Sequence, residues 1–389
     1  MWCYGGITQF CTDILNGFDN NDASILLVCE KTPQDFDLQV KNRNLDIVET
    51  GLSGIGSGTT VTPAIGWLLL QNSARKVTNK LSQIKPDILN PQSFIDVFYS
   101  AYYKLHLDPD VKIRWYAHEP YRWFYDKENW RYGSFFEQVF FAFYRQLFVP
   151  SDKKNVRVFV DSIGSNSKFT AALVKDIYKR ESQIIYPGID TDKFKPSKPV
   201  PKVLEENALG NSIILSVGRI QFSTKNLQVI PAVLQKIRSK RKVIWIHIGT
   251  GADEPRLLDA ARAYGVADYL KILPPDLVHY ELSKFYSAAD VVVYPSVKEP
   301  FGLVPVEAMA CETPVVASKF GGTSETIVNG TTGILVDTNS VYDISKAIFH
   351  VLSNKEVAAA MGRAGRRHVC AEFSLRKTID AYQRFVLAQ

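Results

Sequence analysis

The sequence predicts an α/β protein with two domains, each built on a parallel β-sheet. The chain has 389 residues, which exceeds the size at which one hydrophobic core usually stops growing. Short apolar segments alternate with helical stretches, and this alternation is typical of parallel strands joined by crossover helices. The alternation stops at 195–201, a segment rich in proline and lysine, and then begins again. We therefore expect one domain over 1–194 and a second over 195–370.

The strands are expected at the short apolar segments. In the first domain these are 24–29, 87–90, 111–118 and 156–163, with a helix over 168–179. In the second domain they are 212–218, 242–249, 269–273, 290–296 and 313–318. Ligands of open α/β sheets bind at the carboxyl ends of strands, so a cleft between the two domains is the expected site.

The composition is that of an ordinary folded protein, with 46% hydrophobic and 22% charged residues. The net charge of +6 suits an anionic small ligand, a membrane surface or nucleic acid, so charge alone does not discriminate between them. The five cysteines lack metal-ligand spacing and indicate reduced, cytosolic thiols. The longest apolar runs, such as 64–70, are far below the ~20 residues that a membrane-spanning helix needs.

Two cations follow the first strand of the second domain. Arg219 lies at the end of that strand, and Lys225 comes six residues later, where Ser223 or Thr224 is expected to cap the next helix. Two cations at one strand end predict a clamp for a diphosphate. A pair of solvated surface charges explains this segment about equally well.

The next strand ends in Gly249-Thr250-Gly251. Glycines at this point would let a nucleotide pass close to the backbone. A single Gly-x-Gly is weak evidence, and an ordinary turn is the better explanation of it taken alone.

The most informative segment is "YPSVKEPFGLVPVEAMACETPVVAS", residues 294–318. Pro305 is tolerated only near a helix start, which predicts a helix that begins at about Leu303. The backbone N–H groups of Phe301, Gly302 and Leu303 would then face the cleft.

Two carboxylates flank this helix start, Glu299 before it and Glu307 within it. Carboxylates accept hydrogen bonds from paired hydroxyls, so the segment suits a sugar bound beside a phosphate. A helix capped by acidic side chains is the alternative, and it explains Glu307 but not Glu299 together with the Pro-Phe-Gly turn.

These motifs resemble glycosyltransferase family 4, the retaining nucleotide-sugar transferases with the GT-B fold, in which two Rossmann-like domains face across a cleft. The family's E-x-F-G-x-x-x-x-E signature is matched by Glu299, Phe301, Gly302 and Glu307. Its Arg/Lys pair is matched by Arg219 and Lys225, and its glycine turn by Gly249 and Gly251. The segments "SNSKFTAALVKDIY" and "IIYPGIDTDKF" resemble the end of the family's first domain. The resemblance also implies that 371–389 form a helix that crosses back to the first domain.

The resemblance implies a role for each matched residue. Glu307 would hold the ribose, Glu299 the sugar hydroxyls, and Arg219 with Lys225 the diphosphate. Gly249, Gly251, Phe301, Gly302 and Leu303 would line the donor. We expect no cofactor and no metal, and we interpret the two Asp-x-Asp strings at 108–110 and 190–192 as loop residues.

His118 directly follows an apolar strand of the first domain. A lone histidine there is more often structural, but the family keeps one at this strand end, near the anomeric carbon and the C6 hydroxyl of the donor. Tyr121 and Arg122 would lie on the acceptor side. The His-x-Pro-x-Arg pattern that starts at His118 is similar to a subset of mannosyltransferases, which is a hint toward mannose.

The segment 115–148 is dense in aromatic and basic residues. Its helix, expected from about Ser134, is apolar on nearly every side, which favours burial. Contact with a membrane interface or a lipid-linked acceptor is the weaker alternative.

Gly5 and Gly6 resemble the family's Gly-Gly loop, which follows the first, central strand and faces the diphosphate and the acceptor. Only four residues precede them here. Because loss of a central strand leaves its neighbours unpaired, we expect that the natural protein has a strand upstream of this loop.

The expected function is retaining transfer of a hexose of the mannose or glucose type from a GDP-sugar or UDP-sugar to a glycan or lipid-linked acceptor. The expected location is the cytoplasm, with possible peripheral contact at the cytosolic membrane face and no nucleic-acid partner. The alternatives are a GT-B epimerase or phosphorylase, or a catalytically silent sugar-binding protein.

Overall fold

The computed structural model describes residues 6–18, 25–29, 45–49, 63–120, 125, 135–208, 210–275 and 281–388. The chain divides into two compact units, Met1–Tyr186 with Thr378–Gln389, and Pro187–Lys377. The division falls after Tyr186 rather than after residue 194. The reason is that residues 187–194 bond within the second unit, where Ile189 N–H donates to the Phe373 carbonyl at 2.9 Å.

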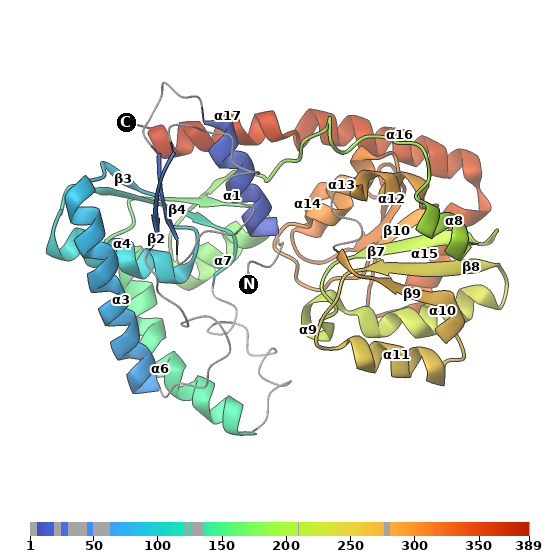
Figure 1. Ribbon diagram of the computed structural model, residues 1–389, viewed down its shortest axis with the longest axis horizontal. Coiled ribbons are helices and arrows are strands. Elements are labelled where there is room, and N and C mark those ends of the chain that lie inside the picture. Colours follow the sequence, from blue (N-terminus) through green and yellow to red (C-terminus); the bar gives the residue numbers. More distant parts are fainter. Residues whose placement is uncertain are drawn as a thin grey trace. The chain divides into compact units, whose positions relative to one another are not determined.

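The described strands of the first unit form two parallel sheets (Figure 1). A two-stranded sheet pairs β1 (Ile25–Cys29) with β2 (Leu45–Glu49). A four-stranded sheet has the order β3-β4-β5-β6, with β3 at Ile88–Leu89, β4 at Lys112–Ala117, β5 at Ser162–Ser165 and β6 at Gln183–Ile184. The parallel pairing confirms the sheet type that the alternation of strands and helices predicts.

The helices of the first unit pack on the two faces of β4 or, for the helix Pro63–Ile84, on neighbouring helices. They are α1 (Gly6–Gly17), α3 (Pro63–Ile84), α4 (Phe94–His106), α6 (Phe135–Val158), α7 (Lys168–Tyr178) and the part of α17 (Leu375–Leu387) from Thr378 onward. Successive strand side chains point to opposite faces. Trp115 therefore packs with α4, α6 and α7, whereas Tyr116 packs with α1 and α17.

Two expectations for α6 are wrong. The segment 156–163 is not one strand, because α6 continues to Val158 and β5 starts at Ser162. Val156 and Val160 are buried against β4, and a short apolar run of this kind has no period that separates strand from helix. The helix is also not buried all round. Val139, Phe143 and Leu147, spaced four residues apart, are 43%, 60% and 47% exposed.

The second unit contains a six-stranded parallel sheet of order β12-β11-β10-β7-β8-β9. The strands are β7 (Ser212–Val217), β8 (Val243–Ile248), β9 (Leu270–Leu273), β10 (Val291–Tyr294), β11 (Val315–Ser318) and β12 (Ile334–Val336). The order runs outward in both directions from the pair β7 and β10. A reversal of strand order of this kind opens a crevice at the carboxyl ends of the two strands.

Helices cover both faces of this sheet (Figure 1). α10 (Ile230–Arg238), α11 (Glu254–Ala263) and α15 (Val341–Ser353) share one apolar core with the strands. α12 (Leu282–Ala288), α13 (Leu303–Ala310) and α16 (Lys355–Glu372) lie on the other face. The remaining short helices are α8 (Lys202–Ala208), α9 (Phe222–Lys225) and α14 (Thr323–Thr326).

Candidate active site

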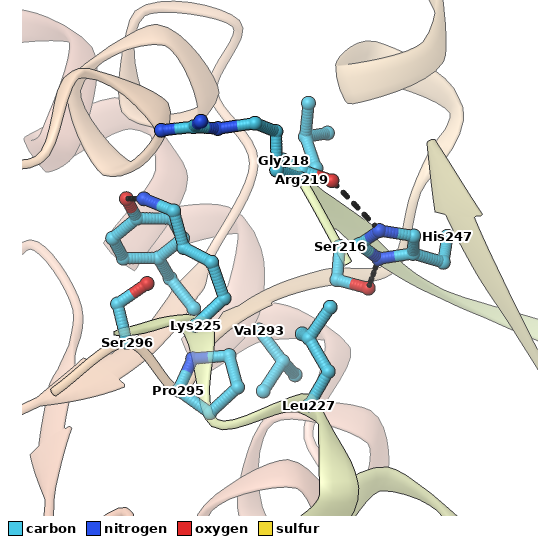
Figure 2. Close-up of a pocket in the computed structure, with 11 residues that line it drawn as sticks. Ser216, Gly218, Arg219, Lys225, Leu227, His247, Val293, Pro295 and Ser296 are labelled. Atoms are coloured by element: carbon cyan, nitrogen blue, oxygen red, sulfur yellow. Dashed lines mark hydrogen bonds between the residues drawn. The ribbon is translucent and has the colours of Figure 1, made fainter. Parts of the chain in front are cut away.

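A pocket lies in the second unit where β7 and β10 end, at the point where the strand order reverses (Figure 2). Its polar lining comprises Ser216, Arg219, Lys225, His247, Tyr294 and Ser296. Arg219 follows β7 and Lys225 ends α9, so the two cations that the sequence singles out line the same pocket.

Lys225 is the centre of this pocket's hydrogen bonding. Its Nζ donates to Glu299 Oε2 at 2.8 Å and to the Tyr294 hydroxyl at 2.9 Å. Burial alone lowers the pKa of Lys225, but the Glu299 carboxylate and Tyr294 outweigh it and hold that pKa above its ordinary value. Burial, together with the Glu299 charge, raises the pKa of Tyr294 to about 12. The pocket therefore carries a charged ammonium group and a neutral phenol.

The expected caps before Lys225 are wrong. Ser223 and Thr224 lie inside α9, whose N-cap is Gln221, and α10 has no side-chain cap. The start of α9 is fixed from the neighbouring loop, because the Phe222 N–H donates to Asp253 Oδ2 at 2.8 Å.

The Gly-Thr-Gly turn lies directly on the Arg219 loop. The Ile220 N–H donates to the Thr250 carbonyl at 2.9 Å. A Cβ at Gly249 would come within 2.0 Å of the Gly218 carbonyl oxygen, and one at Gly251 within 2.2 Å of the Ile220 carbonyl oxygen. The close approach of two backbones thus explains both glycines, and their contact with a donor stays a prediction.

His247 fixes the carbonyl that precedes Arg219. Its Nε2 lies 2.9 Å from the Gly218 oxygen, which can only accept, so Nε2 carries the proton. Nδ1 then accepts from Ser216 Oγ at 2.8 Å, and Ser216 accepts from Trp245 Nε1 at 2.9 Å. Burial lowers the pKa of His247 to about 4, so the ring is neutral at neutral pH. Sequence reasoning missed this residue, whose only signal is a histidine inside an apolar strand.

The segment around Glu299 rests on a second pair of loops. α13 begins at Leu303, as the position of Pro305 predicts, and no side chain caps it. The Gly322 N–H donates to the Glu299 carbonyl at 2.7 Å. A Cβ at Gly322 would lie 1.9 Å from the Pro300 oxygen. The Gly321-Gly322 turn after β11 therefore positions the Pro-Phe-Gly turn, and sequence reasoning missed it although a glycine pair follows a strand there.

Glu307 and Phe301 have partners inside the second unit. Glu307 accepts a hydrogen bond from the Tyr286 hydroxyl at 2.7 Å. The Phe301 ring is buried and meets Phe373 edge-on at 5.7 Å, and Gly302 adopts a φ of 100°. The Phe301 side chain thus belongs to the core, which leaves its backbone for any ligand contact.

His118 lies in the first unit, directly after β4. Its Nε2 is 3.1 Å from Gln92 Oε1, and its carbonyl accepts from Asn166 Nδ2 at 2.7 Å. Burial lowers the pKa of His118 to about 3. Gly6 is the first residue of α1, whereas Gly5, Tyr121 and Arg122 lie outside the described residues.

The two Asp-x-Asp strings form local turns. Asp108 Oδ1 accepts from the Asp110 N–H at 3.0 Å, and Asp190 Oδ1 accepts from the Asp192 N–H at 2.8 Å. Across the described ranges, no group of three or more His, Cys, Asp or Glu side chains is arranged to hold a metal ion. None of the helices in the same ranges is both long and apolar enough to cross a membrane.

Comparison with known proteins connects both halves of the chain to sugar transfer. Residues 4–193 match the model for "Glycosyltransferase Family 4", and residues 203–368 match the model for "Glycosyl transferases group 1". The D-inositol 3-phosphate glycosyltransferase of Geodermatophilus obscurus is 36% identical over 238 residues, which cover 57% of this chain and 51% of that protein. That of Gordonia bronchialis is 33% identical over 237 residues, with the same two coverages. The chain thus spans about half the length of the curated relatives it matches.

Solved structures share the fold. Sucrose-phosphate synthase from Thermosynechococcus elongatus aligns with a TM-score of 0.80 at 20% identity and covers 99% of this chain and 94% of its own. HepE from Anabaena, solved with UDP and glucose, aligns with a TM-score of 0.75 at 16% identity, over 100% of this chain and 98% of its own. WaaG, a glycosyltransferase involved in lipopolysaccharide biosynthesis, aligns with a TM-score of 0.72 at 16% identity. The alignment covers 100% of this chain and 98% of the WaaG chain.

The chain has the GT-B fold, with two parallel-sheet α/β units of the kind seen in these solved structures. Its first half is similar to the Glycosyltransferase Family 4 model and its second half to the group 1 model, and each match covers less than half of the chain.

Proposed function

We propose that this protein is a retaining hexosyltransferase that uses a nucleoside diphosphate sugar. The observation that carries the proposal is the pocket at the strand-order reversal, where Arg219, Lys225 and Glu299 come together. Cations at this place suit a diphosphate, and a carboxylate beside them suits the hydroxyls of the attached sugar. The UDP and UDP-glucose found in the HepE structures belong to the same chemical class.

The proposed roles follow the positions of the side chains. Arg219 and Lys225 hold the diphosphate, and Glu299 exchanges its bond with Lys225 for the sugar hydroxyls. Glu307, half-buried on α13, holds the ribose, and the α13 N-terminus adds backbone N–H groups near the anion. His118 is the proposed side chain for the reacting end of the sugar.

We propose front-face attack for the chemical step. The acceptor hydroxyl attacks the anomeric carbon on the side from which the nucleoside diphosphate leaves. The departing phosphate oxygen takes the hydroxyl proton, and the ammonium and guanidinium groups stabilise its growing negative charge. This route retains the configuration at the anomeric carbon and needs no protein nucleophile and no metal.

For the acceptor we propose a polyol, glycan or lipid-linked hydroxyl. The named relatives act on D-inositol 3-phosphate, which makes a cyclic polyol phosphate the first compound to test. The exposed stripe of Val139, Phe143 and Leu147 on α6 supports peripheral contact with a lipid-linked acceptor at the cytosolic membrane face. The pattern that starts at His118 resembles a subset of mannosyltransferases. GDP-mannose is therefore one of the donors to be tested.

The test is a donor screen that measures release of nucleoside diphosphate. UDP-glucose, UDP-N-acetylglucosamine and GDP-mannose are each incubated with and without D-inositol 3-phosphate or a short glycan, and the anomeric configuration of the product is read by NMR. We expect release from one donor only when an acceptor is present, with retained configuration. Conversion of the donor without an acceptor would identify an epimerase, dependence on inorganic phosphate would identify a phosphorylase, and donor binding without release would identify a silent binding protein.

A further inference from the structure

A hydrogen-bond relay in the first unit runs from a backbone carbonyl to the ring of His118. It starts at the Arg114 carbonyl, which can only accept a hydrogen bond. Asn90 Nδ2 donates to that carbonyl, so Asn90 Oδ1 points the other way. Oδ1 accepts from the Tyr382 hydroxyl at 2.6 Å and from Gln92 Nε2 at 2.7 Å. One backbone oxygen thus sets the orientation of the Asn90 amide.

The same logic sets the Gln92 amide. The Tyr382 hydroxyl gives its hydrogen to Asn90, so its oxygen accepts from Gln92 Nε2 at 2.8 Å. Both hydrogens of the Gln92 amide are then directed at Asn90 and Tyr382. Gln92 Oε1 consequently faces His118 Nε2 at 3.1 Å. Because an amide oxygen only accepts, Nε2 must carry the proton.

We propose that Gln92 is a positioning residue that holds His118 in its Nε2-protonated tautomer, so that the Nδ1 lone pair accepts a hydrogen bond from a substrate hydroxyl. The other tautomer would set two lone pairs against each other at 3.1 Å. Turning the Gln92 amide over would relieve that contact, but it would place its oxygen against Asn90 Oδ1. Turning the Asn90 amide over as well would relieve that second contact, but it would place Asn90 Oδ1 against the Arg114 carbonyl oxygen. Every alternative orientation thus leaves two acceptors facing each other.

Packing fixes the ring plane independently of this relay. Phe10 from α1 and Tyr116 from β4 meet the His118 ring edge-on, with centroids 5.2 Å and 4.9 Å away. The aromatic contacts hold the position of the ring, and the relay decides which nitrogen carries hydrogen. Since burial lowers the pKa of His118 to about 3, the ring acts as a neutral acceptor rather than as a cation or a proton donor.

The inference rests on the proposed function for the identity of the hydroxyl, which belongs to the donor sugar or to the acceptor. The tautomer itself can be measured without any substrate. The full-length protein is labelled with ¹⁵N-histidine, and long-range proton–nitrogen NMR spectra distinguish protonated from unprotonated ring nitrogens. The His118→Ala spectrum assigns the signals.

We expect one neutral Nε2–H form in the wild-type protein. Gln92→Leu removes the acceptor and should give a mixture of tautomers, with kcat for transfer reduced about tenfold or more and the donor KM within about threefold. Gln92→Glu presents a charge to Nε2 and should raise the pKa of His118 by about 1 to 3 units. The control is Gln383→Leu, because Gln383 on α17 donates to the Gly17 carbonyl at 3.3 Å rather than to a member of the relay, and it should leave the His118 signals unchanged.

An Nδ1–H form in the wild-type protein would overturn the relay, and so would unchanged His118 signals in folded Gln92→Leu and Gln92→Glu proteins. If the tautomer is as expected but no donor is turned over, the relay stands and the proposed function fails. If transfer is observed and Gln92→Leu lowers neither kcat nor kcat/KM, the link between the relay and catalysis fails.

Discussion

Lys225 Nζ and Glu299 Oε2 lie 2.8 Å apart, and the two side chains are 18% and 20% exposed. Lys225 is proposed to hold the diphosphate and Glu299 the sugar, yet without a donor they neutralise each other. Donor binding must therefore exchange this pair for two new partners. The ion pair thus preorganises both charges: the ammonium group is positioned for an anion and the carboxylate for hydroxyl groups.

Lys225→Ala should lower turnover at least ~100-fold, the scale of losing one preorganised electrostatic donor. It also leaves the Glu299 carboxylate half-buried without its cation. The measurement is steady-state release of nucleoside diphosphate. Lys240→Ala is the control, since Lys240 is an exposed cation over the Phe349 ring and should leave turnover unchanged. Near-normal turnover of Lys225→Ala would refute the clamp.

Glu299→Gln should have opposite effects on binding of the nucleoside diphosphate leaving group and on the rate of sugar transfer. The amide preserves the shape of the side chain but removes the charge that compensates Lys225. We expect the affinity for the free nucleoside diphosphate to rise several-fold by calorimetry, while turnover falls ~100-fold. Weaker binding of the diphosphate would contradict the idea that Glu299 competes for Lys225.

Gly249→Ala should disturb the Arg219 loop. The added Cβ would lie 2.0 Å from the Gly218 oxygen, at a φ of 143°. Loop displacement and backbone strain together should cost about 2 to 4 kcal/mol of unfolding free energy. Gly330→Ala is the matched control, because its φ is 78° and a Cβ there meets nothing within 4 Å, so only about 1 kcal/mol of strain is expected. Equal losses in urea unfolding would contradict the proposed contact.

His247 should make stability depend on pH. Burial lowers its pKa to about 4 in the folded protein, against about 6.5 when unfolded. The neutral His247 ring therefore adds its full stabilisation above about pH 6.5. As the pH falls toward 4 that stabilisation is lost, which lowers the free energy of unfolding by about 3 kcal/mol.

His247→Gln keeps a donor for Gly218 and an acceptor for Ser216 but does not titrate. The stability advantage of the wild-type protein over this variant should shrink between about pH 7 and pH 5 in urea unfolding. His350→Gln, at an exposed position of α15, serves as the control and should leave the pH dependence intact. A constant advantage of the wild-type protein across this range would show that His247 does not titrate as expected.

The sequence predicts what depends on local rules. Pro305 marks the start of α13 at Leu303, and the pairing of strands follows from their alternation with helices. Local rules failed where tertiary contacts decide. The apolar run from Val156 forms the end of α6, and neither Ser223 nor Thr224 caps the helix that follows Lys225.

The hydrogen-bond networks around His118 and His247 could not be predicted from the sequence. Gln92 and Tyr382 are 290 residues apart along the chain, and His247 is 29 residues from the Gly218 carbonyl that it bonds. No periodicity or motif records such pairings. The role of Gly5 and the expected upstream strand stay predictions.

The contact between the Gly218–Ile220 backbone and the Gly249–Gly251 backbone has a consequence for protein engineering. Gly249 and Gly251 leave no room for a side chain, so most clones of a combinatorial library that randomises these two positions would be destabilised. Selectivity for a different donor must be sought at positions that already carry an exposed side chain, such as Thr250 between the two glycines. Saturating Thr250 while leaving Gly249 and Gly251 unchanged keeps the contact between the two backbones intact.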